Sequence, residues 1–169
     1  MKIIQFLSII TISVVLACSG NDEQRDFENA AYRSPSDITR TNIQGEVTSN
    51  DPDDWRIAPY FQGLVEIQPL YNPPYPNPVT LGTSLHFEIG VTGIQPINGI
   101  DVQVRYSDNT WKNIHSSFNS TLPPGLTTFQ IDPRTLGQFN TPESAKGLHR
   151  IFFFDFNQRL ITYGDILVE

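Results

Sequence analysis

Short segments of alternating apolar and polar residues dominate the second half of the chain, and they constrain its fold most. Residues 100–106 read IDVQVRY, which places Ile100, Val102 and Val104 on one face and polar side chains on the other. An apolar period of two is typical of a half-buried strand. Further strands are expected at residues 64–68, 84–92, 110–118, 126–131, 148–156 and 160–168.

Turn residues between these segments favour sheets over long helices. The chain holds 13 proline and 11 glycine residues, and only 17% of its residues are charged. About seven short strands with turns between them predict an all-β fold, an antiparallel sandwich of immunoglobulin or fibronectin-III type. The Cys–Trp–Cys pattern of true immunoglobulin domains is missing, so this prediction depends on strand number and spacing. A small barrel is the alternative.

The first residues have the three parts of a secretory signal. Lys2 gives a positive start, residues 3–16 are almost wholly apolar, and small residues surround Cys18. The apolar run is short for a bilayer span, which needs roughly 20 residues. Acidic residues follow it instead of a basic flank. We therefore predict that residues 1–17 form a signal peptide that is removed on export.

Leu16-Ala17-Cys18 resembles the lipobox of bacterial lipoproteins. The resemblance implies cleavage before Cys18 and attachment of lipid, including palmitate, to its thiol. Cys18 is the only cysteine of the chain, so an exported form cannot make an internal disulfide. Each buried CH2 of an acyl chain contributes ~0.8 kcal/mol, so several chains would make a durable membrane anchor. A plain signal peptide with an incidental cysteine is the alternative.

Residues just after Cys18 bear on which membrane would hold such a lipoprotein. Ser19 follows the cysteine where an enterobacterial inner-membrane retention signal has aspartate. Asp22-Glu23 is similar to the acidic surface-export signal of Bacteroidota lipoproteins. We expect the protein to be anchored in the outer membrane, and the inner membrane is the alternative. Whether it faces the periplasm or the cell surface stays open.

Charge is concentrated near the start of the mature chain. Removal of residues 1–17 leaves 10 Lys+Arg against 18 Asp+Glu, a formal net charge of −8. Such an acidic chain is a poor nucleic-acid binder and lacks a basic patch for anionic lipid. Residues 18–58 are polar and acidic, which predicts a flexible linker ending in a docking segment. Residues 59–169 are then expected to form the sandwich domain.

A second resemblance begins at Tyr75-Pro76-Asn77-Pro78 and continues in the strand residues 85–89, LHFEI. This stretch resembles the opening of C-terminal β-sandwich domains of Bacteroidota, among them type IX secretion sorting domains. It covers residues 75–169 and implies a sandwich fold, with a sorting domain as one functional alternative. The chain departs from the sorting pattern because it ends on an acidic strand, with Asp165 and Glu169, and not a basic one.

Residues with catalytic or metal-binding chemistry do not cluster in the sequence. His86, His115 and His149 fall on separate expected strands, without metal-ligand spacing. A glycine-rich phosphate loop and a nucleophile elbow are also missing. We therefore predict a protein that is not an enzyme, with no cofactor and no metal site. Asp155 and Asp165 are expected to form structural ion pairs with Arg150 or Arg159.

The densest acidic cluster is Asp51, Asp53 and Asp54. Three close carboxylates could begin a calcium site, but the alternating loop with a bidentate glutamate is missing. A solvated acidic turn is the expected structure, and cation binding stays open.

Aromatic residues outside the expected core suggest a binding face made of Trp55, Tyr60, Phe61 and Trp111. The leading functional hypothesis is a lipid-anchored accessory protein of the cell envelope, a small subunit bound to another envelope protein of a larger membrane complex. The alternative is a surface glycan-binding module, which resembles the accessory lipoproteins of Bacteroidota polysaccharide uptake. It predicts at least two exposed coplanar aromatic rings.

Overall fold

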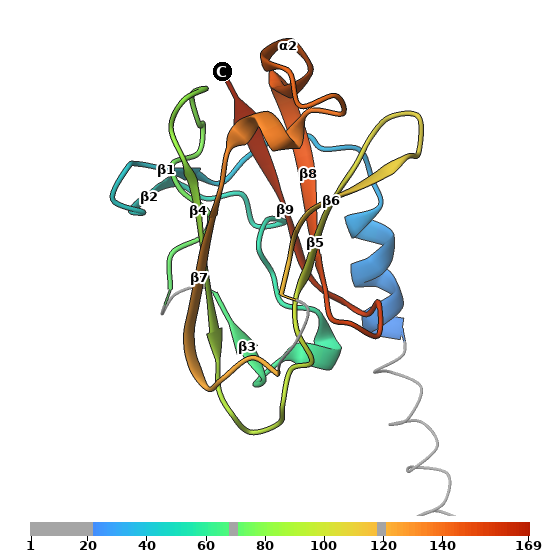
Figure 1. Cartoon of the computed structure of the whole chain (residues 1–169). Coiled ribbons are helices and arrows are strands. Elements are labelled where there is room, and N and C mark those ends of the chain that lie inside the picture. Colours follow the sequence, from blue (N-terminus) through green and yellow to red (C-terminus); the bar gives the residue numbers. More distant parts are fainter. Residues whose placement is uncertain (1–21, 68–70, 118–120) are drawn as a thin grey trace, which may run out of the picture.

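A computed structural model describes residues 22–67, 71–117 and 121–169, and the described chain is mostly β (Figure 1). Within these ranges nine strands form three antiparallel sheets, ordered β6-β5-β8-β9, β3-β4-β7 and β1-β2. The strands are β1 (Arg40–Thr41), β2 (Val47–Ser49), β3 (Val65–Glu66), β4 (Leu85–Val91), β5 (Asp101–Arg105), β6 (Trp111–Ser116), β7 (Gly125–Ile131), β8 (Gly147–Phe154) and β9 (Leu160–Val168).

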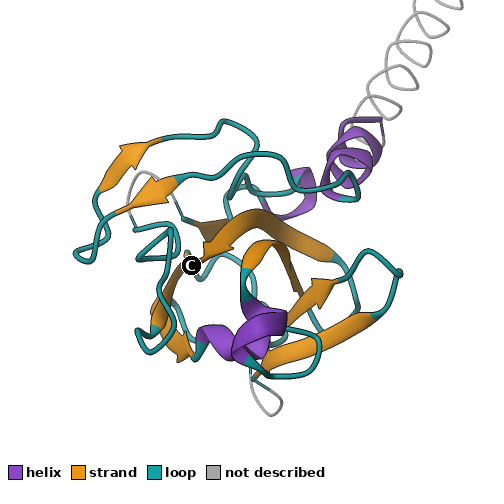
Figure 2. Ribbon diagram, turned by 90° about the horizontal axis from the view of Figure 1, so that it is seen from above, coloured by secondary structure: helices purple, strands orange, loops and turns teal. Residues whose placement is uncertain are grey.

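Helical structure is limited to four short pieces of the described chain. Residues 22–31 form a helix, and the others are η1 (Pro59–Phe61), η2 (Pro133–Leu136) and α2 (Pro142–Ala145). Figure 2 shows the residue 22–31 helix and the β1–β2 ribbon outside the larger sheets. None of the described helices has the length and apolar character needed to cross a bilayer.

The all-β prediction is confirmed, but the predicted count of about seven strands is too low. Each of the seven expected segments overlaps one of the strands β3 to β9 to within one residue at its start. The two further strands, β1 and β2, pair within residues 40–49, which were assigned to the linker. The side chains of β2 are all exposed, so an apolar alternation could not reveal it.

The two larger sheets pack face to face through aromatic side chains. Phe87 on β4 lies 5.6 Å from Phe153 on β8, measured between ring centroids. Phe87 also stacks on Phe129 of the neighbouring strand β7, with the ring centroids 4.8 Å apart. The apolar faces predicted from the period of two therefore meet in one core, and the fold is sandwich-like.

β9 ends its sheet, yet almost all of its residues are buried. Residues of the N-terminal half cover its free edge: the backbone N–H groups of Trp55 and Ala58 donate to Tyr163 and Ile161, both at 2.8 Å. Val79 continues this cover through hydrogen bonds to Leu167 and Glu169. An uncovered edge strand would invite pairing with another chain, so this cover protects the C-terminal strand.

Residues 22–58 differ from the flexible linker that their composition predicts. Phe27, Ile38 and Trp55 are buried in the core although each stands alone among polar residues. Their spacing follows neither a helical nor a strand period, which explains why the sequence suggested a linker. In the described part of that stretch the chain is packed, and residue 59 marks no structural boundary.

Arg150 on β8 fastens the end of the residue 22–31 helix to the sheet. Its Nε and Nη2 atoms donate to the two carboxylate oxygens of Asp165, each at 2.7 Å, and both side chains are buried. Its Nη1 donates to the carbonyls of Ala30, Ala31 and Arg33, at 2.9 to 3.3 Å. Carbonyls at a helix C-terminus lack partners within the helix, and the negative end of the helix dipole also attracts a cation there.

The two structural ion pairs expected for the C-terminal strands are both present. Arg150 pairs with Asp165 in the interior, and Arg159 pairs with Asp155 at 2.6 Å beside the β8–β9 turn. Both carboxylates are therefore engaged within the fold.

Asn77, in the middle of the Pro-Asn-Pro motif, connects three parts of the chain. Its side-chain amide donates to the carbonyls of Thr39 and Asp165, at 2.8 and 2.9 Å. Its Oδ1 accepts from the Leu167 N–H at 3.0 Å. The peptide bonds before Pro76 and Pro78 are both cis. Asn77 is fully buried and uses both donors of its amide, so the motif has a structural task in this fold.

Candidate functional site

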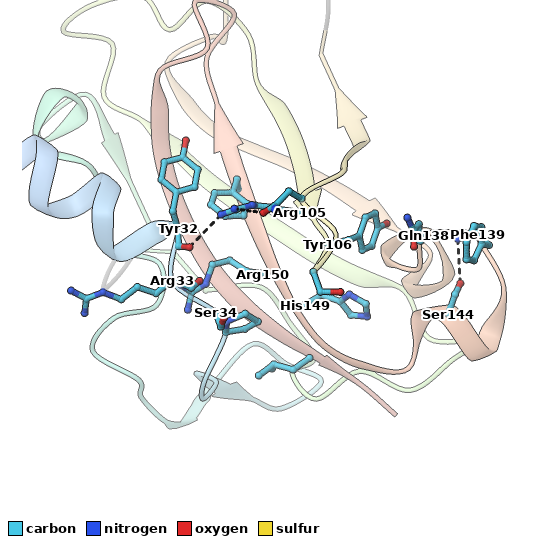
Figure 3. Close-up of a pocket in the computed structure, with 15 residues that line it drawn as sticks. Tyr32, Arg33, Ser34, Arg105, Tyr106, Gln138, Phe139, Ser144, His149 and Arg150 are labelled. Atoms are coloured by element: carbon cyan, nitrogen blue, oxygen red, sulfur yellow. Dashed lines mark hydrogen bonds between the residues drawn. The ribbon is translucent and has the colours of Figure 1, made fainter.

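An open cleft of about 590 Å³ lies between the end of the first helix and the larger sheet (Figure 3). Residues 32–35 form one wall, the ends of β5 and β8 form the floor, and residues 138–144 contribute the far wall. Figure 1 places the β5–β6 turn and α2 at one end of the molecule, and the cleft that residues of these segments line lies toward that end.

Arg105 is the main cation of the cleft. Its Cζ lies 5.7 Å from the ring centroid of Tyr32 and 5.9 Å from that of Trp111. Its Nη1 donates to the Tyr32 carbonyl at 3.3 Å, and its Nη2 donates to Asn109 Oδ1. A guanidinium held by aromatic faces is attracted electrostatically by the rings. Arg105 is thus oriented while three of the five N–H donors of a guanidinium stay available.

Carboxylates are missing from the cleft lining, in contrast to the acidic chain as a whole. The charge of Arg150 is balanced by Asp165, and the Arg33 guanidinium points away from the other labelled side chains in Figure 3. Among the described residues no ion pair includes Arg105. Asp108 stands close by in the β5–β6 turn, but it accepts from Thr110 and Gln138. The cleft is therefore suited to an anionic group.

Two polar side chains of the lining hold the far wall in place. His149 Nε2 lies 2.7 Å from the Ala145 carbonyl, and burial lowers the pKa of His149, which keeps its ring neutral at pH 7. The Tyr106 hydroxyl donates to the Leu136 carbonyl at 3.0 Å, and burial raises the pKa of Tyr106 to about 12. Both side chains are thus engaged with backbone carbonyls of the wall segment.

The four residues predicted as a binding face do not lie together. Trp55 and Phe61 are 3% and 1% exposed, so neither contributes to a surface. Tyr60 is 53% exposed, but it lies outside the cleft lining, beside the start of the first helix, where its backbone N–H donates to Gln24 Oε1. Only Trp111, at 40% exposure, adjoins the cleft, through Arg105.

The sequence did not single out Tyr32, Arg105 and Phe139 as site residues. Tyr32 falls in the segment assigned to the linker, and Arg105 has the outward position of an ordinary strand residue. Phe139 is an isolated exposed aromatic in a loop between η2 and α2. Their shared location arises from contacts between distant segments, and no local pattern signals it.

The acidic turn contains one buried carboxylate and no convergent set. Asp54 accepts from the N–H groups of Thr39 at 2.7 Å and Asp165 at 2.9 Å. Desolvation raises the pKa of Asp54 to about 7. Asp53, by contrast, is exposed, and its N–H donates to Asp51 Oδ1. In the ranges that the structure describes, no group of three or more His, Cys, Asp or Glu is arranged to hold a metal ion.

The remaining histidines stack on aromatic neighbours. His86 lies 5.0 Å from the ring centroid of Tyr75, and His115 lies 4.0 Å from that of Phe129. Together with His149 in the cleft wall, the three histidines occupy three separate places. Cys18, the expected lipid attachment site, lies outside the described residues.

Comparison with protein-family models and with curated proteins gives no match for this chain.

Proposed function

We propose that this chain is a lipid-anchored binding protein of the bacterial cell envelope, without enzymatic activity. Cys18 would hold it in the outer membrane, and the cleft would bind an acidic segment of another envelope protein. One observation carries this proposal: the cleft presents Arg105 between aromatic rings and has no lining carboxylate, in a chain whose mature charge is −8.

The composition of the cleft favours binding over catalysis. Arginine and aromatic residues are the side chains that most often dominate the energy of protein interfaces. His149 and Tyr106, two titratable side chains of the lining, already bond to carbonyls of the wall. A volume of about 590 Å³ is large enough to take several side chains of a partner.

We also propose that the fold is of immunoglobulin or fibronectin-III type, and the arrangement of the two larger sheets supports this assignment. Four antiparallel strands face three, as in seven-stranded sandwiches of that type. The lipobox resemblance and Ser19 support the outer-membrane location, on the periplasmic or the cell-surface face.

Photo-crosslinking in living cells tests the cleft. A benzoylphenylalanine in place of Phe139 should give one adduct of defined mass, which mass spectrometry identifies as an envelope protein. Arg105→Ala in the same chain should reduce the adduct about tenfold, because a hydrogen bond to a charged group contributes about 1.5 kcal/mol. The matched control places the crosslinker at Ile43, which is equally exposed on the β1–β2 ribbon. The same adduct from Ile43, or no effect of Arg105→Ala, would contradict the proposal.

Metabolic labelling tests the anchor separately. Cells fed a clickable palmitate analogue should label the unsubstituted chain and leave Cys18→Ala unlabelled and released from membranes. Label on the substituted chain would refute attachment at Cys18.

Glycan binding is the second candidate, and the exposure of Trp111 beside Tyr32 favours it. The two rings stand at 80°, with centroids 6.2 Å apart, so this pair does not make the coplanar platform expected for sugars. A glycan array with the purified protein distinguishes the readings: binding that Trp111→Ala abolishes would favour the glycan. A type IX sorting role has less support, because the C-terminal strand is buried and Asp165 belongs to the interior network.

A further inference from the structure

Three loops at the end of the molecule opposite the cleft contain no charged residue. They are residues 59–64 (PYFQGL), 92–98 (TGIQPIN) and 121–126 (TLPPGL). Charged residues make up 17% of the whole chain, so three uncharged loops are a distinctive feature of this surface. We call these three segments the loop end.

Contacts between the loops show that they form one surface. The Thr92 hydroxyl donates to the Gly63 carbonyl at 2.8 Å, which joins the first loop to the second. Ile97 and Leu122 form an antiparallel bridge, which joins the second loop to the third. In Figure 1 η1 and the ends of β3 and β4 lie together at the lower end of the molecule.

Large apolar side chains project from each loop. Tyr60 is 53% exposed, Ile94 is 73% exposed and Leu126 is 51% exposed. Exposed apolar residues scattered singly need no explanation, but three on adjoining uncharged loops make a surface suited to an apolar partner. Tyrosine and aliphatic side chains are favourable in the interfacial layer of a bilayer, where aromatic rings are enriched.

The chain upstream of the structure indicates which partner covers this surface. The first helix starts its described part at Asp22, only four residues after Cys18. Four residues span at most about 14 Å in any conformation. The Tyr60 N–H donates to Gln24 Oε1 at 3.3 Å, so the beginning of this helix lies against the first loop. A lipid on Cys18 therefore holds the bilayer within reach of the loop end.

We propose that the loop end rests on the membrane surface, with Tyr60, Ile94 and Leu126 in contact with lipid. This inference rests on the proposed lipid anchor and deepens it. The packed helix leaves no long tether, so the body stands directly on the bilayer. The cleft at the opposite end then faces away from the membrane, toward a partner. At the rim of the loop end, Asp22 and Asp155 are ion-paired with Arg25 and Arg159, whereas Glu23 and Glu66 have no ion pair among the described residues.

Single thiols on the lipidated full-length protein test this orientation. Because Cys18 is the only cysteine, its lipidation leaves Ile94→Cys or Leu126→Cys with one reactive thiol each. The variants are labelled with the polarity-sensitive dye NBD and reconstituted into phosphatidylcholine vesicles. We expect emission at shorter wavelength and protection from iodide quenching at both positions. Ile43→Cys, on the β1–β2 ribbon and 70% exposed, is the matched control and should show neither change.

The possible results separate this inference from the anchor itself. Iodide quenching at positions 94 and 126 equal to that at position 43 overturns the orientation, although the protein stays on the vesicles. A blue shift at all three positions also overturns it, because the body would then lie on its side. If the unsubstituted chain takes up the dye at Cys18, the lipid anchor has failed, and the fault lies with the proposed function.

Discussion

Residues 22–58 and the strands of the larger sheets are held by different forces. The sheets meet through buried aromatic rings such as Phe87 and Phe153. The N-terminal segment also buries apolar residues, but charged and amide groups fix its path. Arg150 binds the end of its helix, and Asp54 binds the Thr39 N–H. This difference teaches that an acidic stretch without apolar periodicity can still be ordered when its backbone finds buried polar partners.

A substitution in the apolar core between the two larger sheets should reduce stability the most. Phe153 is fully buried and contacts Phe87, Phe129 and Trp55. Phe153→Ala would leave a cavity between the sheets, and we expect the free energy of unfolding to fall by about 4 kcal/mol. Urea denaturation followed by tryptophan fluorescence measures this change. Hydrogen exchange should speed up in the sheets and in the N-terminal segment together. A loss below about 1 kcal/mol would show that the core relaxes around the cavity.

Removal of the Arg150 guanidinium, which holds the N-terminal segment, should reduce stability less and loosen a smaller region. Arg150→Ala leaves Asp165 buried without its ion pair, although Asp165 keeps a hydrogen bond from the Ser36 N–H. We expect a loss of about 3 kcal/mol, because breaking a buried pair strands the other charge. Amides of residues 22–31 should then exchange roughly a hundredfold faster, as 2.7 kcal/mol corresponds to two decades.

A control variant separates the charge from the loss of side-chain volume. Arg150→Met with Asp165→Leu removes both charges and keeps apolar bulk, so it should recover part of the stability. Exchange in the residue 22–31 helix should stay fast in this double variant, because the carbonyls of Ala31 and Arg33 still lack their donor. Equal acceleration across all strands would contradict a local role for Arg150.

Sequence patterns revealed the parts of the fold whose cause is local. Strands β3 to β9 were located, most clearly where alternation such as Ile100–Val104 is the direct consequence of one face meeting the core. The ribbon β1–β2 and the packed path of residues 22–58 were missed. Their order depends on Arg150, Asp54 and Asn77, each of which bonds to segments far away in the sequence.

The cleft was missed for the same reason. Trp111 was named as an aromatic residue outside the expected core, but its neighbours in the cleft were not. Tyr32 and Arg105 are separated by more than seventy residues and meet only after the first helix packs on the sheet. Trp55 and Phe61 were placed on the surface in error, since composition alone does not distinguish a docked aromatic from an exposed one.

The carboxyl of Asp54 should make the stability of the polar side depend on pH. Its pKa is raised to about 7 in the folded protein, chiefly by desolvation. The hydrogen bond from the Thr39 N–H lowers this pKa, and the nearby charge of Asp165 raises it. The ordinary value is 3.8, so between pH 4 and pH 7 the folded state binds more protons than the unfolded chain. Stability from this group is therefore fully present below about pH 4 and is lost as the pH rises to 7, by at most about 1.4 kcal/mol per unit.

Urea denaturation at pH 5 and pH 7 measures this slope, and Asp54→Asn is the variant that isolates it. The amide cannot titrate, so the fall in stability between the two pH values should become smaller. The asparagine side chain has one acceptor oxygen where the carboxylate uses two. One hydrogen bond, from the Asp165 or the Thr39 N–H, is therefore lost, and we expect the free energy of unfolding to fall by about 1 kcal/mol at both pH values. Phe153→Ala should keep the full slope, because it leaves the Asp54 carboxyl and its two N–H donors in place. If Asp54→Asn leaves the pH dependence of stability unchanged, another group titrates in this range, and the Asp54 carboxyl does not cause the pH dependence.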